Sequence, residues 1–314
     1  MTILRNIVAG GPSIIRKPGA NRSNLEFTNS LRSHFAAAQQ DYATVAENGG
    51  NAAPSPERKA PTDVWTSREG STLYVPRIEW ATAGLYEEGS RYDITVKLFF
   101  LPSAPVSERR QYAKDAVDLV LKELKVDSID LLIASFPGMS FDGDCEWEAD
   151  KKNALQGNDD DEVATWEAME ELHNLGLVNS LGIAEFGSDK LQRFMKRITV
   201  RPTVDQINLR DCCTVPPPLI KLAKEQRIEL LVHTDCTDIL PTGTLRELLG
   251  PGPQGAGVVS ELANTQNGNA GQNGIAGLRG ELVPQWVVKY TAVVRDRGVI
   301  ENKGYFAGAA LLEG

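Results

Sequence analysis

The sequence has few of the residues that hold metals or cross-link small secreted proteins. It contains four cysteines and three histidines in 314 residues. Four cysteines in a chain of this length do not make a disulfide framework, and no two of them have the spacing of a zinc-binding pair. The histidines, at positions 34, 173 and 233, are far apart in the sequence. These absences predict a protein without a metal site.

The chain also lacks an excess of positive charge and a long apolar segment. Its net charge is −9, which argues against binding to DNA, RNA or an anionic membrane, because each of these needs a basic surface. No apolar stretch approaches the roughly 20 residues needed to cross a bilayer. The first ten residues lack the apolar segment and the cleavage site of a signal peptide. We therefore expect a cytoplasmic protein that binds neither nucleic acid nor membrane.

What is present is typical of a globular protein, since 41% of the residues are hydrophobic and 24% are charged. The length allows one large barrel domain or two ordinary domains. Segments 47–62, 138–161 and 250–280 are poor in apolar residues, and each is predicted to be a surface loop or insertion. Because the same alternation of elements continues between them, we interpret 1–314 as a single domain with flexible inserts at 47–62 and 250–280.

Strand and helix patterns alternate along the chain from residue 94 onward. Short apolar runs predict strands over 94–100, 130–135, 181–186, 204–209, 228–232 and 298–300. Helical spacing predicts helices capped by Ser107 and Ser188, and others over 163–172, 219–224 and 283–294. Two weaker strands, 3–8 and 73–78, bring the number to eight. This pattern predicts the α/β class and a (β/α)8 TIM-type barrel. A doubly wound open sheet is the alternative, although no Gly-x-Gly-x-x-Gly follows the first strand.

Four segments carry a resemblance to a known family. Residues 94–98 (ITVKL), 126–133 (VDSIDLLI), 181–186 (LGIAEF) and 201–208 (RPTVDQIN) resemble strand motifs of the aldo-keto reductase superfamily. The resemblance covers roughly residues 90 to 235 and implies that family's barrel. In the family a tyrosine donates a proton, a lysine, a histidine and an aspartate tune it, and NADPH delivers hydride.

The resemblance is incomplete at the residues that would carry this chemistry. Lys97 and Gln206 match the family's lysine and its nicotinamide-contacting glutamine. Ser135 stands where the family has its catalytic histidine. Ala184 and Glu185 replace the Ser-Asn pair that holds the nicotinamide carboxamide. Losing a general acid-base partner typically costs on the order of 10²–10⁴ in rate, so carbonyl reduction is not expected.

The remaining candidates are weaker matches. Residues 81–86 (ATAGLY) resemble the family's tyrosine motif, with alanine in place of aspartate. Tyr86 precedes Lys97 by fewer residues than a βα unit normally needs. Lys303 matches part of the basic patch that grips the adenosine phosphate of NADPH, but the arginine-rich continuation is missing. We therefore treat Lys97, Ser135 and Tyr86 as vestigial catalytic candidates, and Gln206 and Lys303 as cofactor candidates. No cofactor is expected, and NADP(H) stays an open alternative.

A narrower resemblance involves segments outside these motifs. Residues 207–217 (INLRDCCTVPP), 283–290 (VPQWVVKY) and 297–305 (RGVIENKGY) resemble the modifier, or regulatory, subunit family of glutamate–cysteine ligase. The resemblance implies a non-catalytic partner of the ligase catalytic subunit that improves its use of glutamate and weakens feedback by glutathione. Two other functions stay open: an NADPH-dependent oxidoreductase with an altered site, and a barrel used as a scaffold or cofactor sensor.

The adjacent residues Cys212 and Cys213 allow two interpretations. Neighbouring cysteines are poorly placed to bridge each other, so both can be ordinary thiols, one buried and one in a loop. The alternative is that one of them makes a redox-sensitive bridge to a partner protein, because they follow the strand at 204–209, where barrel loops carry function.

Overall fold

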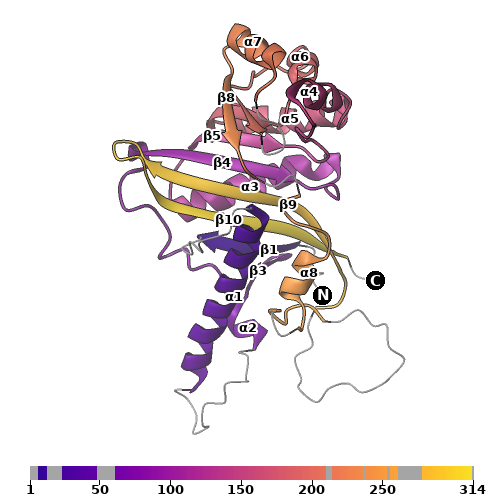
Figure 1. The fold of residues 1–314 in the computed structure, drawn as a ribbon. Helices are drawn as coiled ribbons and strands as arrows, with labels where there is room; N and C mark the ends of the chain where they lie inside the picture. The colour runs from indigo at the N-terminus through magenta and orange to yellow at the C-terminus, as the bar shows by residue number, and fades with distance from the viewer. Residues whose placement is uncertain are drawn as a thin grey trace, which may run out of the picture.

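The computed structural model describes residues 6–12, 23–47, 61–209, 214–235, 238–252, 255–260 and 278–312. They form one sheet with helices on both of its faces (Figure 1). Its strands run in the order β2-β3-β1-β10-β9-β4-β5-β6-β7-β8. The strands are β1 (Asn6–Pro12), β2 (Ser67–Glu69), β3 (Thr72–Val75), β4 (Tyr92–Phe100), β5 (Ile129–Ser135), β6 (Val178–Ala184), β7 (Val204–Asn208), β8 (Glu229–His233), β9 (Glu281–Val294) and β10 (Val299–Leu312).

The helices differ in length and place. They are α1 (Ser23–Glu47), α2 (Thr62–Trp65), α3 (Arg109–Leu124), α4 (Glu146–Asn153), α5 (Asp159–Asn174), α6 (Ser188–Met195), α7 (Pro217–Gln226) and α8 (Thr244–Leu249). Two 3-10 turns, Gly89–Arg91 and Val106–Glu108, precede β4 and α3. Figure 1 shows α4 to α7 gathered at the end of the sheet that holds β8, and α1, α2 and α8 at the other end. Among the described residues, no helix is both long and apolar enough to cross a membrane.

The parallel strands of the sheet agree with the strands predicted from the sequence. Strands β4 to β8 are parallel neighbours in chain order, and helices separate them along the chain. Their apolar runs are buried because helices cover the sheet; Val96 and Leu98 of β4, for example, are inaccessible to water. The predicted α/β class, with the βα units typical of aldo-keto reductases, is confirmed here.

The segment 283–294, which was predicted to be a helix, is a strand in the structure. Residues 281–294 form strand β9, which pairs antiparallel with β4 and with β10, and both β9 and β10 are 14 residues long. Residues Val283, Val287, Tyr290 and Val294 have helical spacing, but the segment is also rich in β-branched side chains. In the strand, Trp286 and Val288 face one core and Val287 faces another. The helix prediction was therefore wrong, because pairing with β4 and β10 decided the structure.

On the far side of β4, the sheet continues with antiparallel instead of parallel strands. Five parallel strands, β4 to β8, continue into antiparallel β9, β10 and β1, and the described strands show no pairing between the two ends, β2 and β8. Among the described residues, the strand–helix alternation of a (β/α)8 barrel is thus seen only over the five strands β4 to β8. Two apolar cores lie on opposite faces of the sheet: one contains residues of α3, α5, α6 and α7, and the other contains residues of α1 and α8.

Several local predictions are corrected by the structure. Ser107 lies inside the turn before α3, whose N-cap is Glu108, and Ser188 is the first residue of α6 rather than its cap. Segment 138–161 is not all loop, because it contains α4 and the start of α5. Of the two predicted inserts, residues 48–60 and 261–277 lie outside the described residues.

Candidate functional site

The carboxyl ends of the parallel strands bring five polar side chains together. Lys97 comes from β4, Glu185 follows β6, and Asn208 ends β7. His233 ends β8, and Asp235 follows it by two residues. Carboxyl ends of parallel strands meet at one edge, which is where such folds place their functional residues. We call this group, together with Lys289 of β9, the strand-end cluster.

Asp235 joins two lysines in this cluster. Its Oδ2 lies 3.1 Å from the Nζ of Lys97, which is only 4% exposed, and its Oδ1 lies 2.8 Å from the Nζ of Lys289. The lysines lie opposite each other in the β4–β9 register. Burial by itself raises the pKa of Asp235, but attraction by Lys97 and Lys289 outweighs it and holds that pKa well below the usual range. Burial lowers the pKa of Lys97, and Asp235 opposes this change.

His233 and Glu185 form the second half of the cluster. The Nε2 of His233 lies 2.7 Å from Oε1 of Glu185, and the backbone N–H of Asp235 donates to Nδ1 of His233 at 3.1 Å. Because Nδ1 accepts, Nε2 carries the proton that is donated to Glu185. The other oxygen of Glu185 accepts from the backbone N–H of Asn208 at 3.3 Å. Both carboxylate oxygens of Glu185 are therefore occupied.

Glu185 adopts a backbone conformation that is unusual for its type. Its φ of +65° lies in the left-handed region, which costs about 1 kcal/mol for a residue with a side chain. Its backbone N–H donates to the carbonyl of Gln206 at 2.8 Å, and its carbonyl accepts from Asn153 Nδ2 at 2.7 Å. These bonds fix the turn after β6 and direct the carboxylate toward His233.

Two polar residues of β7 lie beside the cluster. Asp205 is fully buried, and burial raises its pKa well above the usual range. The adjacent Gln206 has an Oε1 that is buried without a hydrogen-bond partner among the described residues. In none of the residue ranges that the structure describes are three histidine, cysteine or carboxylate side chains placed to hold a metal ion.

The structure places the predicted site residues at different points. Lys97 lies in the cluster, and Gln206 lies beside it. Ser135 is the last residue of β5 and pairs in register with Phe99, two positions beyond Lys97. Tyr86 is 93% exposed, and its N–H donates to Glu301 near the opposite, amino end of β4. Residues Cys212 and Cys213 lie outside the described residues.

The residues present do not fit NADP(H) as the family would hold it. Ala184, in place of serine, offers no polar side-chain group, and Glu185 is committed to His233 and Asn208. Among the described residues at the family's carboxamide-binding positions, the oxygen of Gln206 alone has no hydrogen-bond partner. Lys303, the candidate for the adenosine phosphate, pairs with Glu26 of α1.

Comparison with known proteins identifies the family. The model of the aldo/keto reductase family matches residues 79–248, which is more than half of the chain. The chain belongs to the aldo/keto reductase family. Within it, the chain is similar to the glutamate–cysteine ligase regulatory subunit of Bos taurus, with 26% identity over 224 residues that cover 71% of this chain and 68% of the relative.

Other relatives extend this comparison. A putative glutamate–cysteine ligase regulatory subunit of Schizosaccharomyces pombe is 25% identical over 234 residues, covering 71% of this chain and 72% of the relative. An aldo-keto reductase of Bombyx mori, solved in complex with NADP, aligns with 45% of this chain and 40% of its own at 25% identity and a TM-score of 0.33. The resemblance to the regulatory subunits that the sequence motifs predicted is confirmed.

Sequence reasoning missed half of the strand-end cluster in this family member. His233 and Asp235 lie at the end of a predicted strand, and this position is a usable signal in a parallel sheet. Lys289 lies in a segment that was predicted to be helical, so its place opposite Lys97 was hidden until β9 was known.

Proposed function

We propose that this protein is a non-catalytic, cytoplasmic regulatory subunit of glutamate–cysteine ligase. It binds the catalytic subunit, improves its use of glutamate and weakens its inhibition by glutathione. The observation that carries the proposal is the extent of similarity to the regulatory subunits. That similarity covers 71% of the chain, whereas the family model matches residues 79–248 and an aldo-keto reductase of Oryctolagus cuniculus covers 42%. Membership of the family alone does not account for the additional length.

The strand-end cluster supports the non-catalytic part of the proposal. A catalytic lysine in this family acts on a tyrosine, but here Lys97 contacts the carboxylate of Asp235. Ser135 lacks the ionisable ring of the histidine it replaces, and Tyr86 lies at the other end of β4. A serine hydroxyl does not titrate near neutral pH, so it cannot act there as the family's histidine does.

Regulation of this kind needs a difference in affinity between two states. The protein activates the catalytic subunit only to the extent that it binds the more active state more tightly than the less active one. By the same linkage, glutamate bound to the catalytic subunit strengthens the complex, and glutathione weakens it.

The decisive experiment combines this chain with the glutamate–cysteine ligase catalytic subunit of the same organism. We expect the two to elute together from a sizing column, the KM for glutamate to fall, and the glutathione concentration that halves the rate to rise. The isolated chain, mixed with NADPH and simple aldehydes, should give no turnover. Enzyme-like oxidation of NADPH would overturn the non-catalytic part, and a lack of both co-elution and stimulation would overturn the regulatory part.

The two cysteines provide a further arm of this proposal. We propose that Cys212 or Cys213 forms a redox-sensitive bridge to the catalytic subunit. Stimulation by the wild-type protein should then differ between oxidising and reducing buffer. Cys212→Ser or Cys213→Ser should remove that difference, and Cys145→Ser, which changes a cysteine exposed near the start of α4, is the matched control. Equal stimulation by every variant in both buffers would leave the cysteines as ordinary thiols.

A further inference from the structure

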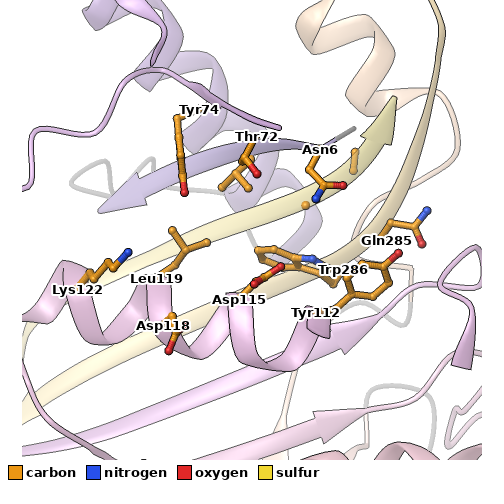
Figure 2. Close-up of a pocket in the computed structure, with 13 residues that line it drawn as sticks. Asn6, Thr72, Tyr74, Tyr112, Asp115, Asp118, Leu119, Lys122, Gln285 and Trp286 are labelled. Carbon is orange, nitrogen blue, oxygen red and sulfur yellow. The ribbon is translucent and has the colours of Figure 1, made fainter. Parts of the chain in front are cut away.

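A hollow lies beside α3 on the face of the sheet that this helix covers (Figure 2). Its volume is about 140 Å³, and residues of α3, β1, β3, β9 and β10 line it. One water needs roughly 10–15 Å³ by this measure, and sites for drug-sized ligands occupy about 300–1,000 Å³. The hollow therefore has room for a group the size of one side chain and is too small for a dinucleotide. We call it the α3 pocket.

The α3 pocket lies between two aromatic side chains of the sheet, Tyr74 and Trp286. The strand register places Tyr74, Val8, Gly308 and Trp286 side by side across β3, β1, β10 and β9. A side-chain carbon at Gly308 would lie only 2.3 Å from the indole of Trp286, so only glycine leaves space for the ring there. Tyr74 and Trp286 thus lie at the two sides of the pocket, and the shorter residues Val8 and Gly308 lie between them.

One face of α3 closes the pocket from the other side. Tyr112, Asp115, Leu119 and Lys122 follow each other at three- and four-residue steps, which places them along one face of the helix. Figure 2 shows Asp115 on the side of α3 that faces Trp286. Asp115 accepts a hydrogen bond from Gln111 Nε2 at 2.8 Å, and the described residues give it no ion pair. Burial raises its pKa above the ordinary value.

The lining also contains one lysine, Lys122. Its ammonium lies 5.8 Å from the ring centre of Trp80, a residue that does not line the pocket. Gln285 also lines the pocket; it is 6% exposed, its Nε2 donates to the carbonyl of Val283, and its Oε1 is buried without a hydrogen-bond partner in the described chain. The pocket therefore combines the carboxylate of Asp115 with aromatic rings.

We propose that the α3 pocket binds a lysine or arginine side chain presented by a partner polypeptide. Aromatic faces and a partly desolvated carboxylate both attract an ammonium or guanidinium group, which also supplies several hydrogen-bond donors. A free amino acid would bring its own carboxylate close to Asp115 and Asp118, whereas a side chain of a polypeptide brings the cation alone. The net charge of −9 favours a basic partner surface. This inference holds for any such partner and does not rest on the proposed function.

Calorimetric titration of the full chain tests this assignment. The probes are Nα-acetyl-L-arginine amide and its neutral counterpart Nα-acetyl-L-citrulline amide. We expect the arginine probe to bind at least tenfold more tightly than the citrulline probe. Asp115→Asn should remove this preference, and Glu167→Gln, on the exposed side of α5 and with the same change in charge, should keep it. Near-ultraviolet circular dichroism checks that both variants fold.

A second variant tests the place of binding rather than its charge. Thr72 lies on β3 two residues before Tyr74 and lines the same pocket, so Thr72→Phe should fill the space and weaken binding of the arginine probe at least tenfold. Equal binding of the two probes, or full retention of the preference in Asp115→Asn, would overturn the proposal. Tighter binding of free L-arginine than of its capped amide would also overturn it, because the site would then serve a free amino acid.

Discussion

Two regions of this molecule hold a carboxylate that is withdrawn from water, and the two carboxylates behave in opposite ways. Asp235 lies in the strand-end cluster, where Lys97 and Lys289 contact it. Asp115 lies in the α3 pocket, where its hydrogen bond comes from the neutral Gln111. Burial raises the pKa of both groups, but the lysines reverse this for Asp235 and hold its pKa low. The number of cations in contact decides the difference.

The two regions differ in whether their charged side chains pair with one another. Those of the strand-end cluster do, whereas Asp115 of the α3 pocket can still accept a cation from a ligand. In the strand-end cluster, where the family carries out its chemistry, Lys97, Asp235, Glu185 and His233 are partners of one another. A ligand binding there would have to replace contacts that already exist. In the α3 pocket a bound cation adds a contact and displaces none of these ion pairs. New binding functions of this chain are therefore to be sought away from the family's catalytic end.

The largest effect is expected from Asp235→Asn. Lys97 would remain buried without a carboxylate in contact, and removing one partner of a buried ion pair typically costs about 3–5 kcal/mol. The free energy of unfolding, measured with urea at pH 7, should fall by this amount. The double variant Lys97→Met with Asp235→Leu should recover most of the loss, because it removes both buried charges.

The pH dependence of the same pair has a fixed sign. The folded-state pKa of Asp235 lies below the unfolded value of about 3.9, so its stabilising effect is present above that pH and is lost as the pH falls through the folded value. Wild type and Asp235→Asn should therefore converge in stability in strong acid. If Asp235→Asn lowered the free energy of unfolding by less than about 1 kcal/mol at pH 7, or if the two proteins did not converge in acid, water would be screening the ion pair. The contrast between Asp235 and Asp115 would then not hold.

An intermediate effect is expected at Glu123, which lies on α3 but faces the core. It is 4% exposed, and burial raises its pKa to about 7. Burial also raises the pKa of Tyr290, whose hydroxyl is buried without a partner in the described residues, and the charge of Glu123 adds to this. Because the folded pKa exceeds the unfolded value of about 4.3, ionisation of Glu123 destabilises the fold.

Glu123→Gln should therefore stabilise the protein as the pH rises. We expect no difference from wild type near pH 4, a difference that grows as the pH rises through about 7, and a constant gain of about 3–4 kcal/mol well above it. Urea unfolding at pH 4, 7 and 9 measures the trend. Asp118→Asn, on the same helix, is the control for removing one carboxylate. A gain independent of pH would mean that Glu123 is not the titrating group.

Some of this fold was accessible from the sequence, and the reason is local. Strands such as 94–100 are largely apolar because helices cover the sheet, so they can be recognised without knowing their neighbours. The segment 283–294 fits both a helix and a strand, and only pairing with β4 and β10 selects the strand. The long helix α1 was missed, although Phe27, Leu31 and Phe35 recur at helical spacing and are buried in the structure.

The strand-end cluster was predictable only in part. Motif matches identified Lys97 and Gln206, because these positions lie within recognisable strands. The contact between Lys97 and Asp235 joins residues 138 positions apart, and no local pattern indicates such a pair. The left-handed backbone of Glu185, which directs its carboxylate toward His233, also depends on the surrounding hydrogen bonds rather than on its own preference.

The smallest effect on stability, and the sharpest contrast with Asp235, is expected from Asp115→Asn. Among the residues that the structure describes, no cation contacts this carboxylate, so its removal should raise the free energy of unfolding at pH 7, by about 0.5 kcal/mol. Because the folded-state pKa is raised, the gain should vanish in acid, where the carboxyl group is protonated in both folded and unfolded chains.

The sign of this change decides between the two descriptions of Asp115. A loss of stability in Asp115→Asn at pH 7, measured by urea unfolding beside Glu167→Gln, would mean that the carboxylate already has a favourable partner within the chain. Asp115 would then resemble Asp235, and the α3 pocket would have no charge to offer a ligand. A gain at pH 7 that disappears near pH 3, together with loss of binding to the arginine probe, describes a carboxylate that destabilises the free protein slightly and becomes useful when a cation reaches it.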